Sequence, residues 1–154
     1  MKKQLSKSEV KDINEQLRVF RYELSKKDQV MLIDDDVKIV LVNNQPEYFY
    51  YQDKIFPTLK NLLKKEILKK IVVDMGAVKF VASGADVMRP GIREIDSGIV
   101  LGEAVVIVDE KNKKPLAVGI ALFSSIDMKA AASGKVIKTV HYVGDKIWNV
   151  DKED

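Results

Sequence analysis

The chain has 154 residues, of which 46% are hydrophobic and 32% charged, and its 26 basic and 23 acidic residues leave a net charge of +3. This composition is typical of a soluble globular protein with one or two small cores, and the charge is too small to indicate a nucleic-acid partner by itself. The absence of cysteine excludes disulfides, thiol catalysis and thiolate-bound metals. Neither a signal-peptide core nor a membrane-spanning window is present, so we expect a cytoplasmic protein without a membrane partner.

The first predicted helix begins after Ser6. Ser6 and Glu9 have the S-x-x-E spacing of a capping box, in which each side chain binds a backbone N–H group that the helix leaves unpaired. Apolar residues that include Ile13 and Leu17 follow at helical spacing and would form one buried face. We therefore predict a helix over residues 7–17.

Two runs of β-branched residues come next and flank a short acidic turn. Residues 29–33 and 37–42 predict a hairpin, and residues 46–51 predict a third strand. The turn holds Asp34, Asp35 and Asp36, which could suggest a metal site. Adjacent carboxylates diverge instead of converging on one ion, so we expect a solvated turn.

A second helix is predicted within residues 55–68. Pro57 suits a helix start, and apolar residues recur at helical spacing. These residues are Leu59, Leu62, Leu63 and Ile67.

The pattern changes after the lysine-rich segment 63–70 to short strands with regular turn signals. We predict a small N-terminal α+β domain over residues 1–69, a second domain over 70–150 and a tail over 151–154. Short strands in so small a region favour a closed or partly closed barrel, which makes the fold class α+β. The strands are expected in residues 69–74, 91–95, 102–110, 115–125, 134–144 and 145–150, with a short helix within 76–88.

Three glycines lie close together in residues 72–92. Gly76 follows a strand and opens a helix, so the N–H groups of residues 76–78 would be free to bind a phosphate. Gly84 suits the left-handed position at the end of that helix. Gly91 follows Pro90 and allows a sharp turn with close approach of another backbone or a ribose.

These residues resemble a known family. The segments "VDMGAVKFVASGADVMRPGI", "PLAVGIALFSS" and "GKVIKTVHYVGDKIW" closely resemble the PUA domain, an RNA-binding module, over about residues 70–150. The order of a small α+β domain and a PUA domain is similar to the malignant T-cell amplified family of translation factors and its stand-alone archaeal relatives. The resemblance implies a pseudo-barrel that recognises structured RNA, often the acceptor (CCA) end of tRNA.

The resemblance also implies where RNA would bind. The face used by the family lies around the helix after the first barrel strand and the last barrel strand. Lys135 and Lys138 would add phosphate contacts from that strand. The other positions carried over to this chain are Gly76, Ala77, Lys79, Ser83, Arg89, Pro90 and Gly91.

No arrangement of residues points to catalysis. His141 is the only histidine, so paired histidine metal sites are excluded, and no G-x-S-x-G motif is present to supply a nucleophile. We expect no enzyme, no cofactor and no metal. The aromatic run at residues 48–51 could stack bases, although alternation should place at least half of it in the core. Trp148 is expected to pack the last strand onto the barrel.

The sequence therefore favours an RNA-binding protein of translation that recognises the tRNA acceptor end or ribosomal RNA. The N-terminal domain would dock to a translation-factor partner or to the small ribosomal subunit. Two alternatives stay open. One is an accessory subunit that brings RNA to a modifying enzyme such as a pseudouridine synthase or transglycosylase, and the other is a protein-interaction module that does not bind RNA. The basic cluster proposed for docking comprises Lys64, Lys65, Lys69 and Lys70.

Overall fold

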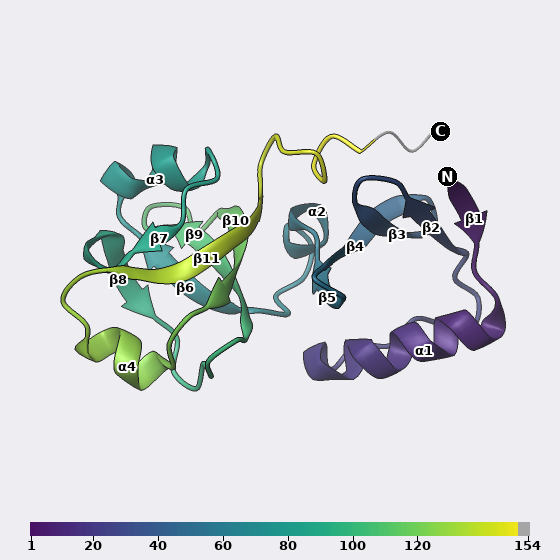
Figure 1. The fold of residues 1–154 in the computed structure, drawn as a ribbon, viewed down its shortest axis with the longest axis horizontal. Helices are drawn as coiled ribbons and strands as arrows, with labels where there is room; N and C mark the ends of the chain where they lie inside the picture. Colours follow the sequence, from purple (N-terminus) through teal and green to yellow (C-terminus); the bar gives the residue numbers. More distant parts are fainter. Residues whose placement is uncertain (151–154) are drawn as a thin grey trace.

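The computed structural model describes residues 1–150; the tail expected at 151–154 lies outside the described residues. Two β-sheet units lie side by side along the long axis of the molecule, with α2 between them (Figure 1). The first sheet has the order β1-β2-β3-β4-β5 and is antiparallel throughout. Its elements are β1 Lys2–Gln4, β2 Val30–Asp34, β3 Lys38–Val42, β4 Gln45–Tyr51 and β5 Lys54–Pro57, with α1 Lys7–Leu17, η1 Arg18–Phe20 and α2 Leu59–Leu62.

The predicted first helix is confirmed as α1. The Glu9 N–H donates to Ser6 Oγ at 3.1 Å, and the Ser6 N–H donates to Glu9 Oε1 at 3.0 Å, which completes the capping box. Ile13 and Leu17 are buried against one face of the first sheet, where the fully buried Tyr48 lies. The hairpin is also confirmed, and its register pairs Asp34 with Lys38 across the acidic turn.

The helix predicted within residues 55–68 is largely wrong. Pro57 ends strand β5 instead of starting a helix, because Phe56 pairs with Phe49 of β4 and their rings stack at 5.4 Å. The helix begins only after Thr58, whose hydroxyl accepts from the Asn61 N–H, and it is a single turn. The apolar spacing that favoured a helix thus belongs partly to a strand.

The second sheet has the order β7-β11-β10-β9-β6-β8, with β6 and β9 parallel and all other pairs antiparallel. It curls around one apolar core to form a pseudo-barrel, which confirms the predicted α+β fold class. Its strands are β6 Lys69–Val73, β7 Val87–Met88, β8 Ile92–Ile95, β9 Ala104–Asp109, β10 Pro115–Ala121 and β11 Lys135–Tyr142, and its helices are α3 Met75–Val81, η2 Arg89–Gly91 and α4 Ser125–Ala130.

Residues 145–150 do not form the predicted strand. The Asp145 side chain accepts from the Trp148 N–H at 2.9 Å, and the Asn149 N–H donates to the Asp145 carbonyl, so the chain coils into turns. This segment leaves the barrel and crosses back over the first unit (Figure 1). Lys146 there lies 3.6 Å from Asp36 in the hairpin turn.

The two units share an apolar cluster. The face of the first sheet opposite α1 contributes Phe49 and Phe56, and the outside of the barrel contributes Val106 and Val118 to the same cluster. Trp148 packs against this shared cluster and not inside the barrel. Burial of this continuous apolar surface holds the units together.

Candidate nucleic-acid interface

The residues predicted to bind RNA lie on or directly after three elements of the barrel, which are α3, η2 and β11. β7 pairs with β11, with Met88 opposite Lys135, and the Thr139 hydroxyl of β11 donates to the Ala85 carbonyl in the segment before β7. Figure 1 shows α3 above β7 with β11 beside them. Gly76, Ala77 and Lys79 lie on α3, Ser83 follows it, Arg89, Pro90 and Gly91 form η2, and Lys135 and Lys138 lie on β11.

The amide groups at the start of α3 are not all free, so the predicted phosphate site is wrong for Ala77. Its N–H donates to the Asp74 carboxylate at 2.8 Å, which caps the helix. The Met75 N–H donates to Glu110 Oε2 at 2.9 Å. Two carboxylates therefore occupy the positive end of this helix, where they oppose a bound phosphate.

The glycines of this region serve backbone packing. Gly84 has φ +96°, as predicted for the end of the helix, and a Cβ there would lie 2.6 Å from the Tyr142 ring. A Cβ on Gly91 would lie 3.0 Å from that of Ala77, and the Gly91 carbonyl accepts from the Asp74 N–H at 2.9 Å. The close approach that Gly91 allows is thus an approach of η2 to α3.

Arg89 is held by backbone carbonyls. Its Nε donates to the Met128 carbonyl at the end of α4 at 2.7 Å, and its Nη1 donates to the Ile92 carbonyl at 3.4 Å. The side chain is half-buried. Arg89 therefore ties η2 to α4 and β8, and its guanidinium has little freedom to follow a ligand.

Asp86 fixes the two lysines of β11. Lys135 Nζ lies 3.3 Å and Lys138 Nζ 4.0 Å from Asp86 Oδ2, while Asp86 Oδ1 accepts from the Thr139 N–H at 2.9 Å. Although partial burial acts in the opposite direction, the Thr139 N–H and the two ammonium groups hold the pKa of Asp86 below its usual value. The lysines are thus held side by side, with one of their two charges balanced.

Sequence reasoning missed an exposed apolar group on the same elements. Phe80 of α3 is 59% exposed and Met88 of β7 is 51% exposed. Lys79 Nζ lies 5.2 Å from the centre of the Phe80 ring. Helical periodicity could have predicted this exposure. Val81 lies on the buried side of α3, and Phe80, one residue before it, lies on another side of the helix. An exposed aromatic ring beside cations suits an unstacked base.

The basic cluster proposed for docking is internally engaged. Lys65 Nζ donates to the Tyr22 hydroxyl at 2.9 Å and lies 4.1 Å from the centre of that ring. The other three lysines form ion pairs, at 2.6 Å for Lys64 with Glu47, 3.0 Å for Lys69 with Glu103 and 3.0 Å for Lys70 with Glu66. This cluster therefore presents less free positive charge than its sequence suggests.

The other sequence candidates have structural roles. Tyr48 and Phe49 are fully buried, so the aromatic run does not form an open stacking platform. Within residues 1–150, no group of three or more acidic or histidine side chains is placed to hold a metal ion. No helix in this part of the chain is long and apolar enough to cross a membrane.

Comparison with known proteins gives matches over both units. The PUA domain model matches residues 69–143, and a domain of unknown function, DUF1947, matches residues 2–65. The chain is 50% identical over 151 residues to an uncharacterized protein of Methanocaldococcus jannaschii, covering 94% of this chain and 93% of that protein. It is 35% identical over 130 residues to Translation machinery-associated protein 20 of Eremothecium gossypii, covering 79% and 71%. It is 33% identical over 134 residues to Malignant T-cell-amplified sequence 1 of Danio rerio, covering 82% and 74%.

Solved structures agree with this arrangement. A hypothetical protein of Pyrococcus horikoshii superposes with a TM-score of 0.82 at 41% identity, over 97% of this chain and 99% of that one. A PUA domain protein of Aeropyrum pernix, in complex with tartrate, gives a TM-score of 0.87 at 27% identity, over 100% and 91%. A chain of an H/ACA ribonucleoprotein bound to a substrate RNA gives 0.51 at 29% identity, over 62% of this chain and 29% of that larger one.

Proposed function

Because this chain belongs to the family of PUA-domain proteins that includes Translation machinery-associated protein 20 and Malignant T-cell-amplified sequence 1, we propose that it binds RNA in translation. It acts by binding and not by catalysis. The proposed binding surface is the barrel face formed by α3, β7 and β11, which we name the α3 face.

The exposed ring of Phe80 carries this proposal. It lies beside Lys79 on α3, and β7, which follows α3, pairs with the strand that carries Lys135 and Lys138. A base stacked on the exposed ring would thus have these ammonium groups available to its phosphate. Sequence-independent phosphate contacts then supply affinity, and stacking selects a base that is not paired. Such a surface suits a single-stranded end beside a helix.

We propose the acceptor end of tRNA as the ligand, since its unpaired CCA follows a duplex stem. The carboxylates of Asp74 and Glu110 at the start of α3 exclude phosphate from that point. The RNA end therefore lies over the C-terminal half of α3, toward Phe80 and β11, and not at the N-terminal glycine Gly76.

Binding of deacylated tRNA with and without its terminal CCA tests this proposal. Removal of CCA should weaken binding at least tenfold, about 1.4 kcal/mol. The remaining affinity should fall with salt, since it comes from phosphate contacts. Equal affinity for both RNAs would contradict recognition of the acceptor end.

A second candidate is an accessory role in RNA modification. It is favoured by the similarity of the barrel to a chain in an H/ACA ribonucleoprotein bound to substrate RNA. Copurification with a modifying enzyme would support this role, whereas sedimentation with small ribosomal subunits would support a role in translation.

A further inference from the structure

The unpaired positive charge of the N-terminal unit is concentrated around α1. Within residues 1–150, its cations that have neither an ion-pair nor an aromatic partner lie mostly on α1 and in the segment that follows it. All of them are exposed. They are Lys7, Lys11, Arg18, Arg21, Lys26 and Lys27 on and after α1, together with Lys38 and Lys54 elsewhere.

Helical geometry aligns three of these cations. At 3.6 residues per turn, Lys7, Lys11 and Arg18 project within about 40° of one another around the axis of α1. These three cations form a stripe along α1. Asn14 borders the stripe, and the buried face of the helix lies beyond Asn14. Asp12 and Glu15 lie on the opposite side of the stripe, so a polyanion would approach between them and the following segment.

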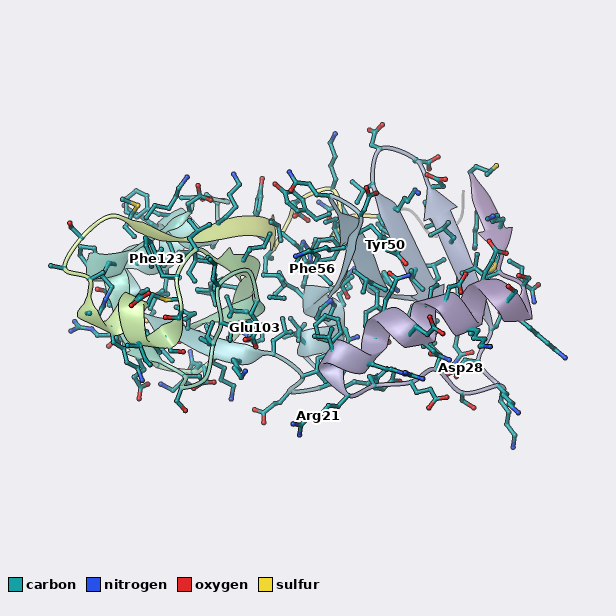
Figure 2. All side chains as sticks on the ribbon, turned by 60° about the horizontal axis from the view of Figure 1, so that its bottom comes forward. Arg21, Asp28, Tyr50, Phe56, Glu103 and Phe123 are labelled. Carbon is teal, nitrogen blue, oxygen red and sulfur yellow. The ribbon has the colours of Figure 1, made fainter. Side chains whose placement is uncertain are left out.

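The following segment runs back along α1 and extends the stripe. The Tyr22 N–H donates to the Leu17 carbonyl, the Leu24 N–H to Asn14 Oδ1, and the Leu5 N–H to the Val30 carbonyl. The chain thus passes from one end of α1 to the other. Figure 2 shows Arg21 near one end of the helix and Asp28 toward the other.

The segment therefore adds three cations along the same edge. Arg21 lies at the end of η1, and Lys26 and Lys27 come between the levels of Asn14 and Leu5. The acidic side chains of this segment are Glu23 and Asp28, and Asp28 is held by the Ser25 N–H and the Asn43 amide.

The stripe also reaches an open cleft between the two units. Arg21 lines this cleft of about 720 Å³, which runs from η1 past Lys54 to the edge of the barrel at Glu103. Figure 2 labels Arg21 on the first unit and Glu103 on the barrel. Residues of both units line this cleft, so it connects the end of the stripe at Arg21 with the barrel.

We propose that the α1 stripe, defined as Lys7, Lys11, Arg18 and Arg21, is a second RNA surface that contacts the phosphate backbone of a helical RNA. The proposal rests on the proposed function for the nature of the ligand. It differs from the α3 face in chemistry, because the stripe offers cations without an exposed aromatic ring and so reads charge and not bases.

The salt dependence of RNA binding tests the proposal. The variant Lys7→Gln/Lys11→Gln/Arg18→Gln keeps good helix formers in α1 and removes three charges. Its matched control is Lys111→Gln/Lys114→Gln/Lys129→Gln, which removes three exposed charges of the barrel that form no ion pair within residues 1–150. The RNA probes are a deacylated tRNA and a blunt-ended RNA hairpin without single-stranded ends.

For both probes, the α1 variant should make the negative slope of log K against log salt shallower by about 2 to 3, since each lost phosphate contact removes about 0.7 to 0.9 from its magnitude. The control should leave the slope unchanged, and both variants should melt at the wild-type temperature. An unchanged slope for the α1 variant, or an equal fall for the control, would overturn the proposal. Loss of CCA discrimination tests the α3 face separately, so failure of one surface is distinguishable from failure of the other.

Discussion

His141 Nε2 accepts a hydrogen bond from the Leu59 N–H at 3.1 Å and so joins the last strand of the barrel to the first residue of α2. The ring is completely buried, its Nδ1 lies 2.9 Å from Asp145 Oδ2, and its edge packs on Phe49 at 5.1 Å between ring centres. Nε2 must be unprotonated to accept, so Nδ1 carries the proton and donates to Asp145. The only histidine of the chain therefore connects the two units.

Replacement of this ring should loosen the connection. His141→Phe keeps the apolar contact with Phe49. It leaves the buried Leu59 N–H without an acceptor and removes one hydrogen-bond donor to Asp145. An unsatisfied buried group costs about 1–3 kcal/mol, and we expect a loss of stability in that range on urea unfolding. Val143→Ala, at a partly exposed neighbour, is the control and should change little. Wild-type stability of His141→Phe would argue against this role.

Acid should weaken the same connection through Asp145. Although burial acts in the opposite direction, hydrogen bonds from His141 and from the Trp148 and Tyr142 N–H groups hold the pKa of Asp145 below its usual value. A lowered folded-state pKa stabilises the fold above the unfolded-state value of about 3.9, and this stability is lost as pH falls through the folded-state pKa. Asp145→Asn should therefore be less stable than the wild type at pH 7, with the difference shrinking toward pH 3. Parallel curves of unfolding free energy against pH would contradict this.

Arg89 should matter for folding more than for RNA. Arg89→Ala removes the hydrogen bonds to the Met128 and Ile92 carbonyls, and bonds from charged donors contribute about 1.5–3 kcal/mol. We expect a loss of stability of about that size in thermal or urea unfolding. Arg93→Ala is the matched control, since the Arg93 side chain is 63% exposed and its ion pair with Glu110 is long, at 3.8 Å. A large fall in RNA affinity with unchanged stability would instead assign Arg89 to the ligand.

Phe80 should show the opposite behaviour. Because its ring is 59% exposed, Phe80→Ala should leave stability nearly unchanged. Loss of base stacking should weaken binding of CCA-ended tRNA by about 1–3 kcal/mol. Ile126→Ala, at a 79% exposed position of α4, is the control for removal of exposed apolar surface. Similar affinities for both variants would remove Phe80 from the binding surface.

The sequence predicted best those features that depend on nearby residues. The capping box of α1 and the left-handed Gly84 need only their own turn of chain, and both are present as predicted. The helix expected from Pro57 failed because the partner of Phe56 is Phe49 on another strand. The strand expected at residues 145–150 is absent, because the Asp145 carboxylate accepts hydrogen bonds from His141 and from the Trp148 N–H and so holds this segment in turns.

The same distinction applies to the candidate site. The resemblance placed the helix after the first barrel strand and the last barrel strand on one face, whereas β7, which follows α3 and pairs with β11, was not predicted as a strand. The occupation of the α3 amides by Glu110, 35 residues from Met75 in the chain, and the use of Arg89 to hold α4 depend on tertiary contacts that spacing does not reveal. The exposed Phe80 was open to prediction from helical phase.

The most direct test of the account is a titration of ¹⁵N-labelled protein with an acceptor-stem RNA minihelix ending in CCA, followed by amide chemical shifts. The account predicts saturable shifts that concentrate on Lys79, Phe80, Met88, Lys135 and Lys138, and that weaken there when CCA is removed. Shifts confined to other surfaces, or a spectrum that does not change at low salt, would contradict RNA binding at the α3 face.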